Sequence, residues 1–507
     1  MAANTNQRAR IVSIPAPVRG LNLRNSPAQL APQDALVLEN VVCRPTFVEV
    51  RKGRQDHKTG FGSNIETLMT YLGTSGSAKL FAATSSAIYD ATIAGAVGAA
   101  VVSSLTSGQW SYTQVTNVAG HFLLAVNGAD AGQKYDGTSW AAMSITGVAT
   151  TALDYITVWK RRVWAVEKNT LNAWYLATDA ISGAATRFDF SAIFRRGGKL
   201  VALINWTMDA GSGVDDHLLA VTSAGELAVY QGTDPASAST FALKGVYDIG
   251  APVGRRFFSQ LGGDVVMLTS VGLVSVSSLL QSSNLSRTPV ISDSIGDQLR
   301  SDVRTFGSQS GWEVLTFIEE NLLLVQVPSG SVGSRSQWVM NTMTKAWSHL
   351  SISPAITFTT FDGSLYCGQS DRVSNCWTGG LDGTAGITYR IIPAFSYFGS
   401  PGQLKKFGLA RAHIRADSSP VYAVKLLRDF DTSVQFPSQV PSPPSGSAWG
   451  IAHWGVDVWG GSATFYRRWS SVTGAGLTAA LAIEGIHSGA TWQLYASDYS
   501  FEMGGPA

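Results

Sequence analysis

The sequence contains few charged residues: they make up 14% of its 507 positions, against about 25% in ordinary globular proteins. Its 37 basic and 35 acidic side chains nearly cancel and leave a formal net charge of +2. This balance gives no electrostatic basis for tight nucleic-acid binding. Few charges, many glycines and many aromatics favour a turn-rich β protein that buries surface against other subunits. The low charge alone would also fit a poorly soluble monomer.

Cysteine is scarce, with only Cys43, Cys367 and Cys376 in the chain. Their number is odd and their spacing matches no metal-binding motif. Cys367 and Cys376 flank one expected hairpin, which places them to face each other across it. We interpret them as buried reduced thiols, because cysteine usually packs as a small apolar side chain, and we expect folding in a reducing compartment.

The sequence has no long apolar run. Residues 1–10 lack the apolar core of a secretory signal. The longest soft run, residues 91–105, is interrupted by glycine and is shorter than the roughly 20 residues of a membrane-spanning helix. We therefore expect no membrane-spanning segment.

Motifs for catalysis or cofactor binding are also lacking. None of the seven histidines is paired at HxxxH spacing, and neither a G-x-S-x-G elbow nor a Walker sequence occurs. Gly474, Gly476 and Ala479 match a dinucleotide pattern, but a strand-like LAIEGI follows where that fold needs a helix. The prediction is a protein with no catalytic residues, no metal and no cofactor, and not an enzyme. A site assembled from distant strands would not be visible in the sequence.

Short hairpins dominate what the sequence does contain. Residues 217–232, HLLAVTSAGELAVYQG, hold an apolar run, a turn containing Gly225 and an alternating return strand. The run is typical of a strand buried on both faces, and the alternation of a half-buried partner. Related units begin at residues 80, 122, 163, 218, 265, 322 and 364.

The spacing of these units, from 41 to 57 residues, is close to the period of propeller blades, roughly 40–50 residues with several strands each. We therefore predict an all-β fold with a propeller-like body of repeated antiparallel hairpins. A plain series of β-sandwich hairpins is the alternative, because hairpins recur in any all-β protein.

Three segments outside the repeats carry local predictions. Pro32 and Asp34 favour a short helix over residues 35–40, and the alternation at residues 48–50 favours an edge strand. Apolar residues spaced by four predict one amphipathic helix, capped by Ser292 or Asp293. They are Ile291, Ile295, Leu299 and Val303.

These patterns divide the chain into three regions. Residues 1–54 are expected to form an N-terminal arm and docking segment, and residues 55–390 the propeller-like body. Residues 391–507 are expected to form a C-terminal β-sandwich-like domain, interrupted by a Pro/Ser-rich loop at 435–447.

Basic doublets recur along the chain, and two of them are candidate subunit-interface sites. Arg195 and Arg196 are followed by Gly197 and Gly198, so that arginine forks sit beside backbone that allows close approach. Arg255 and Arg256 form the second candidate. The alternative for each doublet is a solvated loop or strand end that contributes little.

Two stretches give the chain a family resemblance. Residues 20–53 combine a Gly-Leu-Asn turn, DALVLENVVCRP and EVRKG, and residues 161–263 include RRVWAVEKNTLNAWYL, FRRGGKLVALINW and VYDIGAPVGRRFF. Together they resemble the tail nozzle, or tail tubular protein B-like, proteins of short-tailed bacteriophages. The resemblance extends over about residues 1–390 and is weaker beyond.

The resemblance implies a structural protein of the virion tail, assembled in the bacterial cytoplasm. It implies a ring of six copies below the portal and tail adaptor, which docks fibres or spikes and passes viral DNA at ejection. Two rival functions remain open: a tail-associated glycan or peptidoglycan hydrolase, and a receptor-binding propeller that recognises a host glycan.

Overall fold

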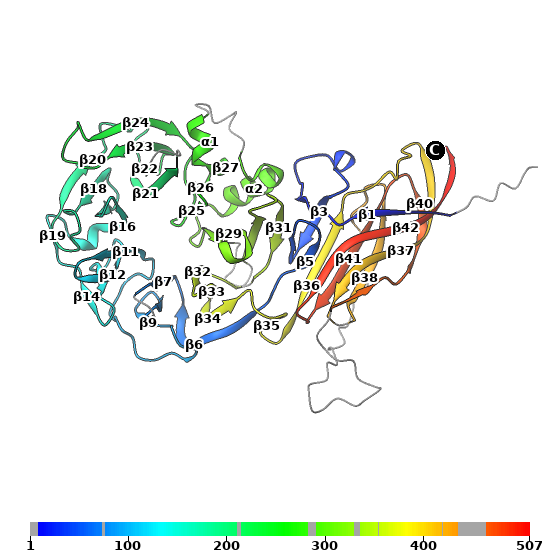
Figure 1. Cartoon of the computed structure of the whole chain (residues 1–507), viewed down its shortest axis with the longest axis horizontal. Coiled ribbons are helices and arrows are strands. Elements are labelled where there is room, and N and C mark those ends of the chain that lie inside the picture. Colours follow the sequence, from blue (N-terminus) through cyan, green and yellow to red (C-terminus); the bar gives the residue numbers. More distant parts are fainter. Residues whose placement is uncertain are drawn as a thin grey trace, which may run out of the picture.

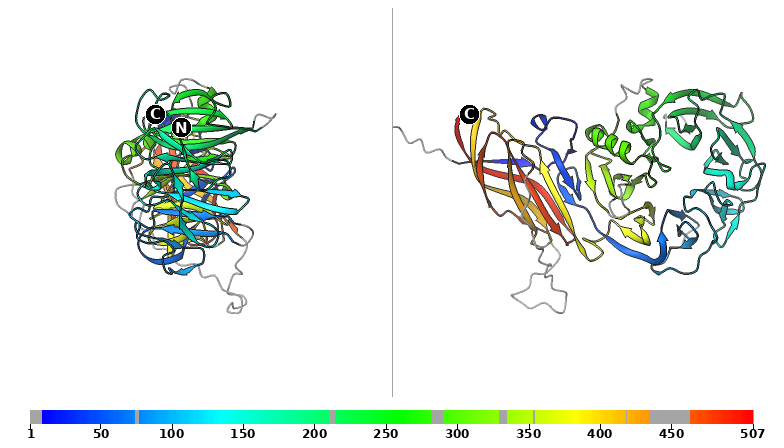
Figure 2. Two further views of the ribbon diagram at one scale, coloured as in Figure 1. Left: turned by 90° about the vertical axis from the view of Figure 1, so that its left-hand side faces the viewer. Right: turned by 180° about the vertical axis from the view of Figure 1, so that it is seen from behind.

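The computed structural model of the chain describes residues 9–73, 77–209, 214–281, 290–328, 335–352, 354–417, 419–433 and 463–506. Strands hold 55% and helices 6% of the residues, which confirms the predicted all-β class. Figure 1 shows a ring of small sheets with a second, elongated β domain beside it. Figure 2 shows the ring from behind and edge-on.

Five separate antiparallel sheets form consecutive blades of a propeller. The first two consist of β7 (Thr67–Tyr71), β8 (Lys79–Ala83) and β9 (Ile88–Asp90), then β11 (Ser111–Asn117), β12 (Gly120–Val126), β13 (Gln133–Tyr135) and β14 (Trp140–Ala142). The next two consist of β16 (Leu153–Trp159), β17 (Arg162–Glu167), β18 (Asn172–Tyr175) and β20 (Thr186–Asp189), then β21 (Leu200–Asp209), β22 (Val214–Thr222), β23 (Glu226–Gly232) and β24 (Phe241–Asp248). The fifth consists of β25 (Phe258–Leu261), β26 (Asp264–Thr269) and β27 (Gly272–Ser275).

The two ends of a 15-stranded sheet complete the circuit. One end is β28 (Glu313–Phe317), β29 (Leu322–Val327), β30 (Ser336–Asn341) and β31 (Trp347–Leu350). The other is β32 (Thr357–Phe361), β33 (Ser364–Gly368) and β34 (Ser370–Cys376), joined by β6 (Arg54–Asn64). Because β6 comes from the N-terminal side of the ring and pairs with β34, the two ends of the propeller sequence close on each other.

Each predicted hairpin unit lies in a different one of these blades or groups. Separate apolar clusters fill the spaces between neighbours; Met69, Phe81, Trp110 and Leu123, for example, join the first two blades. The propeller prediction is therefore confirmed, and the plain sandwich series is not what the chain forms.

The hairpin at residues 217–232 forms as predicted, with Leu218 opposite Tyr230 and Val221 opposite Leu227. Its return strand β23 is not half-buried, however. Leu227 packs into one apolar cluster and Tyr230 into another. The reason is tertiary: β23 is an inner strand of its blade, and an apolar cluster covers each of its two faces.

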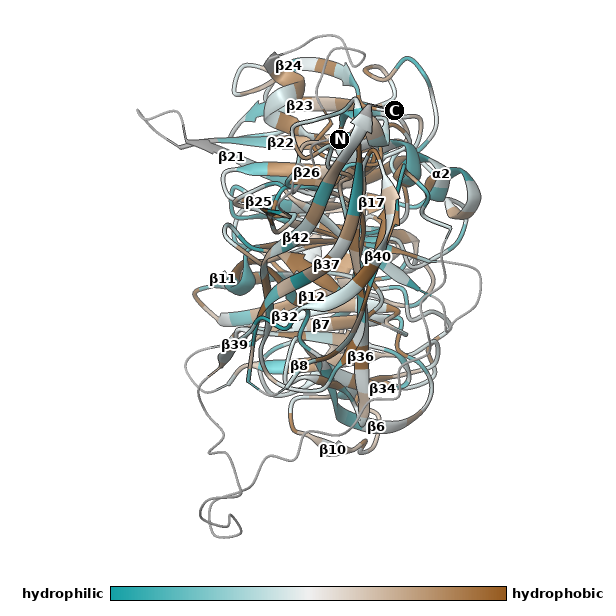
Figure 3. Ribbon diagram, turned by 90° about the vertical axis from the view of Figure 1, so that its right-hand side faces the viewer, coloured by the Kyte–Doolittle hydropathy of each residue, from teal (hydrophilic) through white to brown (hydrophobic). Residues whose placement is uncertain are grey.

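The second domain packs two sheets against each other in a nearly closed arrangement. One sheet contains β1 (Arg10–Pro15), β4 (Val41–Cys43), β5 (Val48–Val50), β37 (Gln403–Ala416), β39 (Thr464–Tyr466), β40 (Ser470–Gly476) and β42 (Trp492–Pro506). The other contains β3 (Asp34–Glu39), β36 (Ala385–Pro393), β38 (Val421–Arg428) and β41 (Ala479–His487). Figure 3 views this domain from the end away from the ring, with β37, β40 and β42 in front.

The N-terminal region is part of this second domain. β1 pairs with β42 from Arg10 opposite Phe501 to Pro15 opposite Ala496. From residue 10 onward the expected arm is therefore an integral strand, while residues 1–8 lie outside the described residues. The Pro/Ser-rich loop at 435–447 also lies outside the described residues. The domain boundary expected at residue 390 falls inside strand β36.

Two local predictions need correction. The helix expected over residues 35–40 is wrong: Asp34–Glu39 is strand β3, held between β31 and β36, and the short 3-10 helix lies earlier, at Pro27–Gln29. The amphipathic helix is correct in kind but begins later, as α2 (Gly296–Phe306) after a 3-10 turn at Asp293–Ile295. Its N-cap is Ile295, without a side-chain cap. A second short helix, α1 (Val276–Gln281), was not predicted.

Two other local predictions are confirmed. The strand at Val48–Val50 forms as β5, although it pairs with both β4 and β42 and is therefore not the expected edge strand. The cysteines are free and buried, and the Cys376 thiol donates a hydrogen bond to the sulfur of Cys367 across the hairpin. None of the described helices is long and apolar enough to span a membrane.

Candidate functional site

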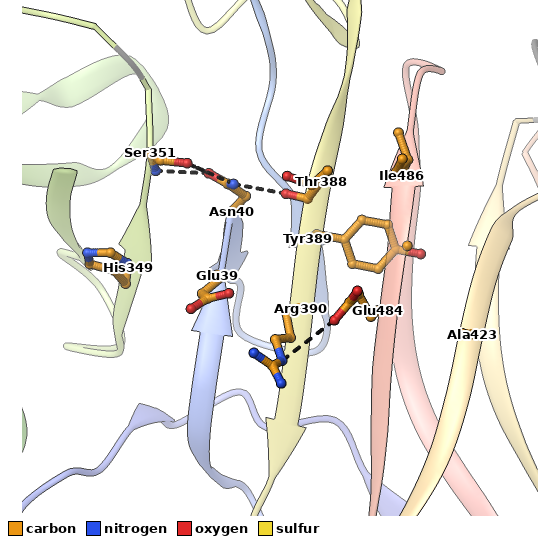
Figure 4. A pocket seen from close by; sticks show the side chains of 11 residues that line it. Glu39, Asn40, His349, Ser351, Thr388, Tyr389, Arg390, Ala423, Glu484 and Ile486 are labelled. Carbon is orange, nitrogen blue, oxygen red and sulfur yellow. Dashed lines mark hydrogen bonds and ion pairs between the residues drawn. The ribbon is translucent and has the colours of Figure 1, made fainter. Parts of the chain in front are cut away.

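A pocket of about 510 Å³ lies where the propeller meets the second domain. Its floor is a row of cross-strand neighbours: His349 on β31, Glu39 on β3, Arg390 on β36 and Glu484 on β41. Residues directly opposite each other on paired strands point to the same face of a sheet. The register therefore brings residues from four distant parts of the sequence into one pocket (Figure 4).

The charges of this pocket partly neutralise one another. The Arg390 guanidinium lies 3.7 Å from a Glu484 carboxylate oxygen, and both side chains are partly exposed. Such a pair contributes about 1 kcal/mol at most. Burial lowers the pKa of His349, and the nearby Asp302 carboxylate partly offsets that effect. His349 is consequently a neutral imidazole at pH 7, packed against Trp338 with ring centres 4.7 Å apart.

Asn40 fixes the wall of the pocket at the joint between the two parts (Figure 4). Its side-chain amide donates to Ser351 Oγ at 3.0 Å and to the Thr388 carbonyl at 2.9 Å. Its carbonyl oxygen accepts from the Ser351 backbone N–H and from Arg51 Nε, each at 2.9 Å. Asn40 has φ +55°, a left-handed conformation that asparagine tolerates better than most residues.

Arg51 extends the same joint. Its side chain is almost fully buried, and its guanidinium contacts both carboxylate oxygens of Asp382, at 3.0 and 2.6 Å, and the Ser351 carbonyl at 3.0 Å. A fork that binds a carboxylate at two points fixes orientation as well as position. This region is therefore a hydrogen-bonded joint beside a polar pocket. No cluster of three or more potential metal ligands occurs in the described ranges.

Arg195 and Arg196 lie on a surface turn ahead of β21. Their backbone N–H groups donate to the buried Glu226 carboxylate at 2.9–3.1 Å, and the Arg196 side chain reaches Asp248 at 2.8 Å. Gly197 and Gly198 follow at φ +69° and +84°. Beside this turn is a hollow of about 530 Å³.

The wall of that hollow is the outer strand β24, where Leu243 and Val246 are 43% and 39% exposed. β24 pairs only with β23 among the described strands. Apolar side chains on an open strand edge, next to arginines, have the composition of a protein contact surface. The interface prediction for Arg195, Arg196, Gly197 and Gly198 remains untested by a single chain.

Arg255 and Arg256 lie inside the propeller, just before β25. Arg255 binds the Asp154 side chain of β16 at 2.6 Å. Arg256 donates to Thr67 Oγ1 at 2.6 Å and to Thr357 Oγ1 at 3.0 Å, which belong to two other blades. This doublet therefore joins blades within one chain, and its role between subunits is likewise untested.

Sequence reasoning missed the pocket residues Glu39, His349, Arg390 and Glu484, and it also missed Glu313, a buried carboxylate beside Arg256. Glu313 begins β28, is buried, and accepts from the Phe358 backbone N–H at 2.9 Å. Burial raises the pKa of its carboxyl group, and the Arg256 guanidinium 3.8 Å away counteracts that shift. A lone acidic residue at the start of an apolar strand was the only available signal, and it does not reveal the blades that converge there.

No family model and no curated protein matches the chain. Among solved structures, the β-propeller domain of Cps50 (Swd1) from Myceliophteria thermophila is 10% identical with a TM-score of 0.38, covering 62% of this chain and 99% of that one. The computationally designed Ika8 protein is 11% identical with a TM-score of 0.36, covering 64% and 99%. BBS1N, solved in complex with ARL6DN, is 11% identical with a TM-score of 0.39, covering 64% and 96%.

Proposed function

We propose that the protein is a structural subunit of a short phage tail, which forms the distal nozzle ring. The observation that carries the proposal is the position of residues 20–53, the first stretch that resembles nozzle proteins. In the fold this stretch supplies β3, Asn40 and Arg51, which connect the propeller to the second domain by strand pairing and hydrogen bonds. Such connections suit a subunit that closes a ring, because each copy has to present two different surfaces in register.

In the proposed assembly, six copies form a ring below the portal and tail adaptor. The ring extends the DNA-ejection channel and carries fibres or spikes on its outside. The near-neutral charge of the chain supports this role, because a conduit should not hold DNA tightly. The Arg195–Gly198 turn and the neighbouring edge strand β24 are the proposed contact with the next copy.

Electron microscopy of the purified protein, alone and mixed with portal–adaptor particles, tests the proposal. Rings at the distal end of the particles are the expected result. A protein that never binds these particles, yet releases sugars or peptides from host envelopes in a dose-dependent way, would replace the nozzle with the hydrolase.

A further inference from the structure

Cys367 and Cys376 form a buried pair of thiols in the group of strands where β6 closes the propeller (Figure 1). Cys367 lies on β33 opposite Ser374 of β34, and Cys376 lies two residues further along β34, opposite Leu365. Side chains two residues apart on a strand point to the same face of the sheet. Both thiols therefore enter the same apolar cluster, and the Cys376 thiol donates to Cys367 Sγ at 2.6 Å.

Gln369 makes Cys367 the acceptor of this pair. Its side-chain N–H donates to Cys367 Sγ at 3.3 Å, and its carbonyl oxygen accepts from Arg54 of β6 at 3.4 Å. Burial by itself raises the pKa of the Cys367 thiol, but the hydrogen bonds from Cys376 and Gln369 outweigh burial and hold that pKa below its usual value. Burial and the bond to Cys367 raise the pKa of Cys376. Because the thiolate is the nucleophile in cysteine chemistry, Cys367 is the sulfur that reacts first.

Cys43 is a natural reference for this pair. It is buried as deeply, but its hydrogen-bonding contacts among the described residues are with oxygen: the Pro17 carbonyl at 3.4 Å and Ser348 Oγ at 3.9 Å. Burial raises the pKa of Cys43 to about 12, so it stays protonated at neutral pH. A comparison of Cys43 with the pair therefore separates the effect of pairing from the effect of burial.

We propose that Cys367 and Cys376 are a site of oxidative modification, at which a peroxide converts the two thiols into a disulfide. The Cys367 thiolate attacks one peroxide oxygen, the O–O bond breaks, and the leaving hydroxide takes up the proton that Cys367 had released and becomes water. The Cys376 sulfur then attacks the sulfenic acid on Cys367, and the hydroxyl group leaves as a second water with the Cys376 proton. Two thiols and one hydrogen peroxide thus give one disulfide and two waters.

The disulfide ties β33 to β34, the strand on which β6 closes the propeller. Its formation brings the two sulfur atoms from 2.6 Å to about 2.05 Å. The bond also restricts the unfolded chain, but the loop that it closes is short, so the gain in stability is modest. The closing group of strands is thereby strengthened once the protein is outside a reducing environment.

Hydrogen peroxide added to the folded full-length chain tests the proposal. After the remaining thiols have been blocked under denaturing conditions, trypsin cleaves behind Arg372, between the two cysteines, so that an oxidised pair gives two peptides that separate only on reduction. Both sulfurs are buried, so the reaction waits for local opening of the blade and should be gradual. We expect this linked pair of peptides with Cys43 still free. No linked peptides, or loss of the Cys43 thiol as fast as the pair, would overturn the proposal.

Thermal unfolding of the oxidised chain gives a second measurement. The unfolding midpoint should fall by about 3–5 °C when a reductant is added, because the unfolded chain regains the freedom that the disulfide removed. The same reductant should leave the midpoint of chain that was never oxidised unchanged.

Serine variants assign the roles of the two sulfurs. Cys376→Ser keeps a donor to Cys367 but removes the second sulfur, so peroxide should leave a sulfenic acid on Cys367, which dimedone traps. Cys367→Ser should leave Cys376 unlabelled under the same exposure. Cys43→Ser is the matched control and should form the disulfide as wild type does. Labelling of Cys376 in Cys367→Ser as fast as that of Cys367 in Cys376→Ser would overturn the assignment of Cys367 as the reacting sulfur.

If a serine variant does not fold, the wild-type chain still decides the matter, because Cys43 serves as its internal reference. The disulfide does not depend on ring formation, so the two proposals fail separately: oxidation is measured on the isolated chain, and ring formation on particles.

Discussion

Single buried polar side chains connect parts of this protein that are remote in sequence. Arg256 reaches Thr67 and Thr357 on two other blades, and Asn40 reaches Ser351 and Thr388 on either side of the joint. A hydrogen bond of this kind adds only about 1 kcal/mol when it is made. Loss of one partner costs more, because the other partner remains buried without a bond.

Glu226 offers a direct test of the cost of removing one partner from a buried hydrogen bond. Its buried carboxylate accepts from the backbone N–H groups of Arg195 and Arg196. Glu226→Ala should lower the free energy of unfolding by about 1–3 kcal/mol, because these donors lose their acceptor. Urea denaturation measures the change. Glu319→Ala, at an exposed glutamate, should stay within about 0.5 kcal/mol of wild type.

The buried His349 predicts a pH dependence of stability. Its folded-state pKa is lowered by burial, whereas the unfolded chain has a histidine pKa near 6.5. Below about pH 6.5 the unfolded state therefore binds more protons than the folded state, and stability falls as pH falls. Unfolding experiments between pH 7 and 5 should show this slope, and a smaller slope in His349→Gln.

His487 has its pKa lowered by burial in the same way, so its effect has the same sign. Combining His487→Gln with His349→Gln should flatten the profile further. A slope as steep in the double variant as in wild type would assign the pH dependence to other groups.

At the scale of secondary-structure elements, tight turns set the blades close together. Gly225 turns β22 into β23 with φ +85°, and a Cβ atom there would lie 2.4 Å from the carbonyl carbon of Gly250. Gly262 turns β25 into β26 with φ +62°, but a Cβ atom there would meet nothing within 4 Å. The two glycines thus share a left-handed backbone conformation, but only at Gly225 would an added Cβ atom clash with neighbouring backbone.

This difference can be measured with two alanine variants. Gly262→Ala should cost about 1–2 kcal/mol, the penalty for a left-handed conformation. Gly225→Ala should cost clearly more, because backbone of the adjacent loop must also move. Thermal and urea unfolding of both variants give the comparison; equal losses would mean that the loop adjusts freely.

For the whole molecule, the proposed ring depends on contacts between copies. Reversal of Arg195 and Arg196 to glutamate leaves their backbone bonds to Glu226 in place, so the monomer should remain folded. A desolvated interfacial charge that loses its partner costs about 2–5 kcal/mol, so ring assembly should weaken. Sedimentation of assembled protein measures the effect. Arg161→Glu is the control, and an unchanged profile in the double reversal would show that the doublet is plain surface.

The timing of ring formation is the second prediction at this scale. We expect the isolated protein to be mainly monomeric at micromolar concentration and to form rings when adaptor-bearing particles are supplied. We expect a segment that becomes ordered only on docking to control this step, and the sequence suggested residues 1–20. Residues 10–15 instead form the β1 strand, so the candidate is narrowed to residues 1–8. Light scattering and electron microscopy of a chain lacking residues 1–8 should show a folded protein that no longer enters tails; incorporation at the wild-type level would end that role.

Deletion as far as residue 17 has a different expected outcome. It removes all of β1 and exposes one edge of β42. The second domain should lose stability, so failure of that variant to assemble would not by itself concern timing. The shorter deletion is therefore the informative one.

Much of the propeller could be predicted from local sequence, because a hairpin is a local structure. The run from Leu218 to Val221, the turn at Gly225 and the alternation after it specify two paired strands within sixteen residues. The recurrence of that pattern predicted the ring of blades. A turn residue and the spacing of apolar residues act within a few positions of the chain. The hairpins could therefore be predicted without knowledge of distant contacts.

Tertiary structure decided the rest, because the deciding contacts join residues hundreds of positions apart. Pro32 and Asp34 are typical of the first turn of a helix, yet pairing with β31 and β36 makes residues 34–39 a strand. The N-terminal strand β1 completes a sheet with the C-terminal β42, and β6 closes the ring on β34. The row from His349 to Glu484 exists only once those pairings are made. Composition and hairpin pattern thus determine the all-β class, whereas long-range strand pairing determines where the polar groups meet.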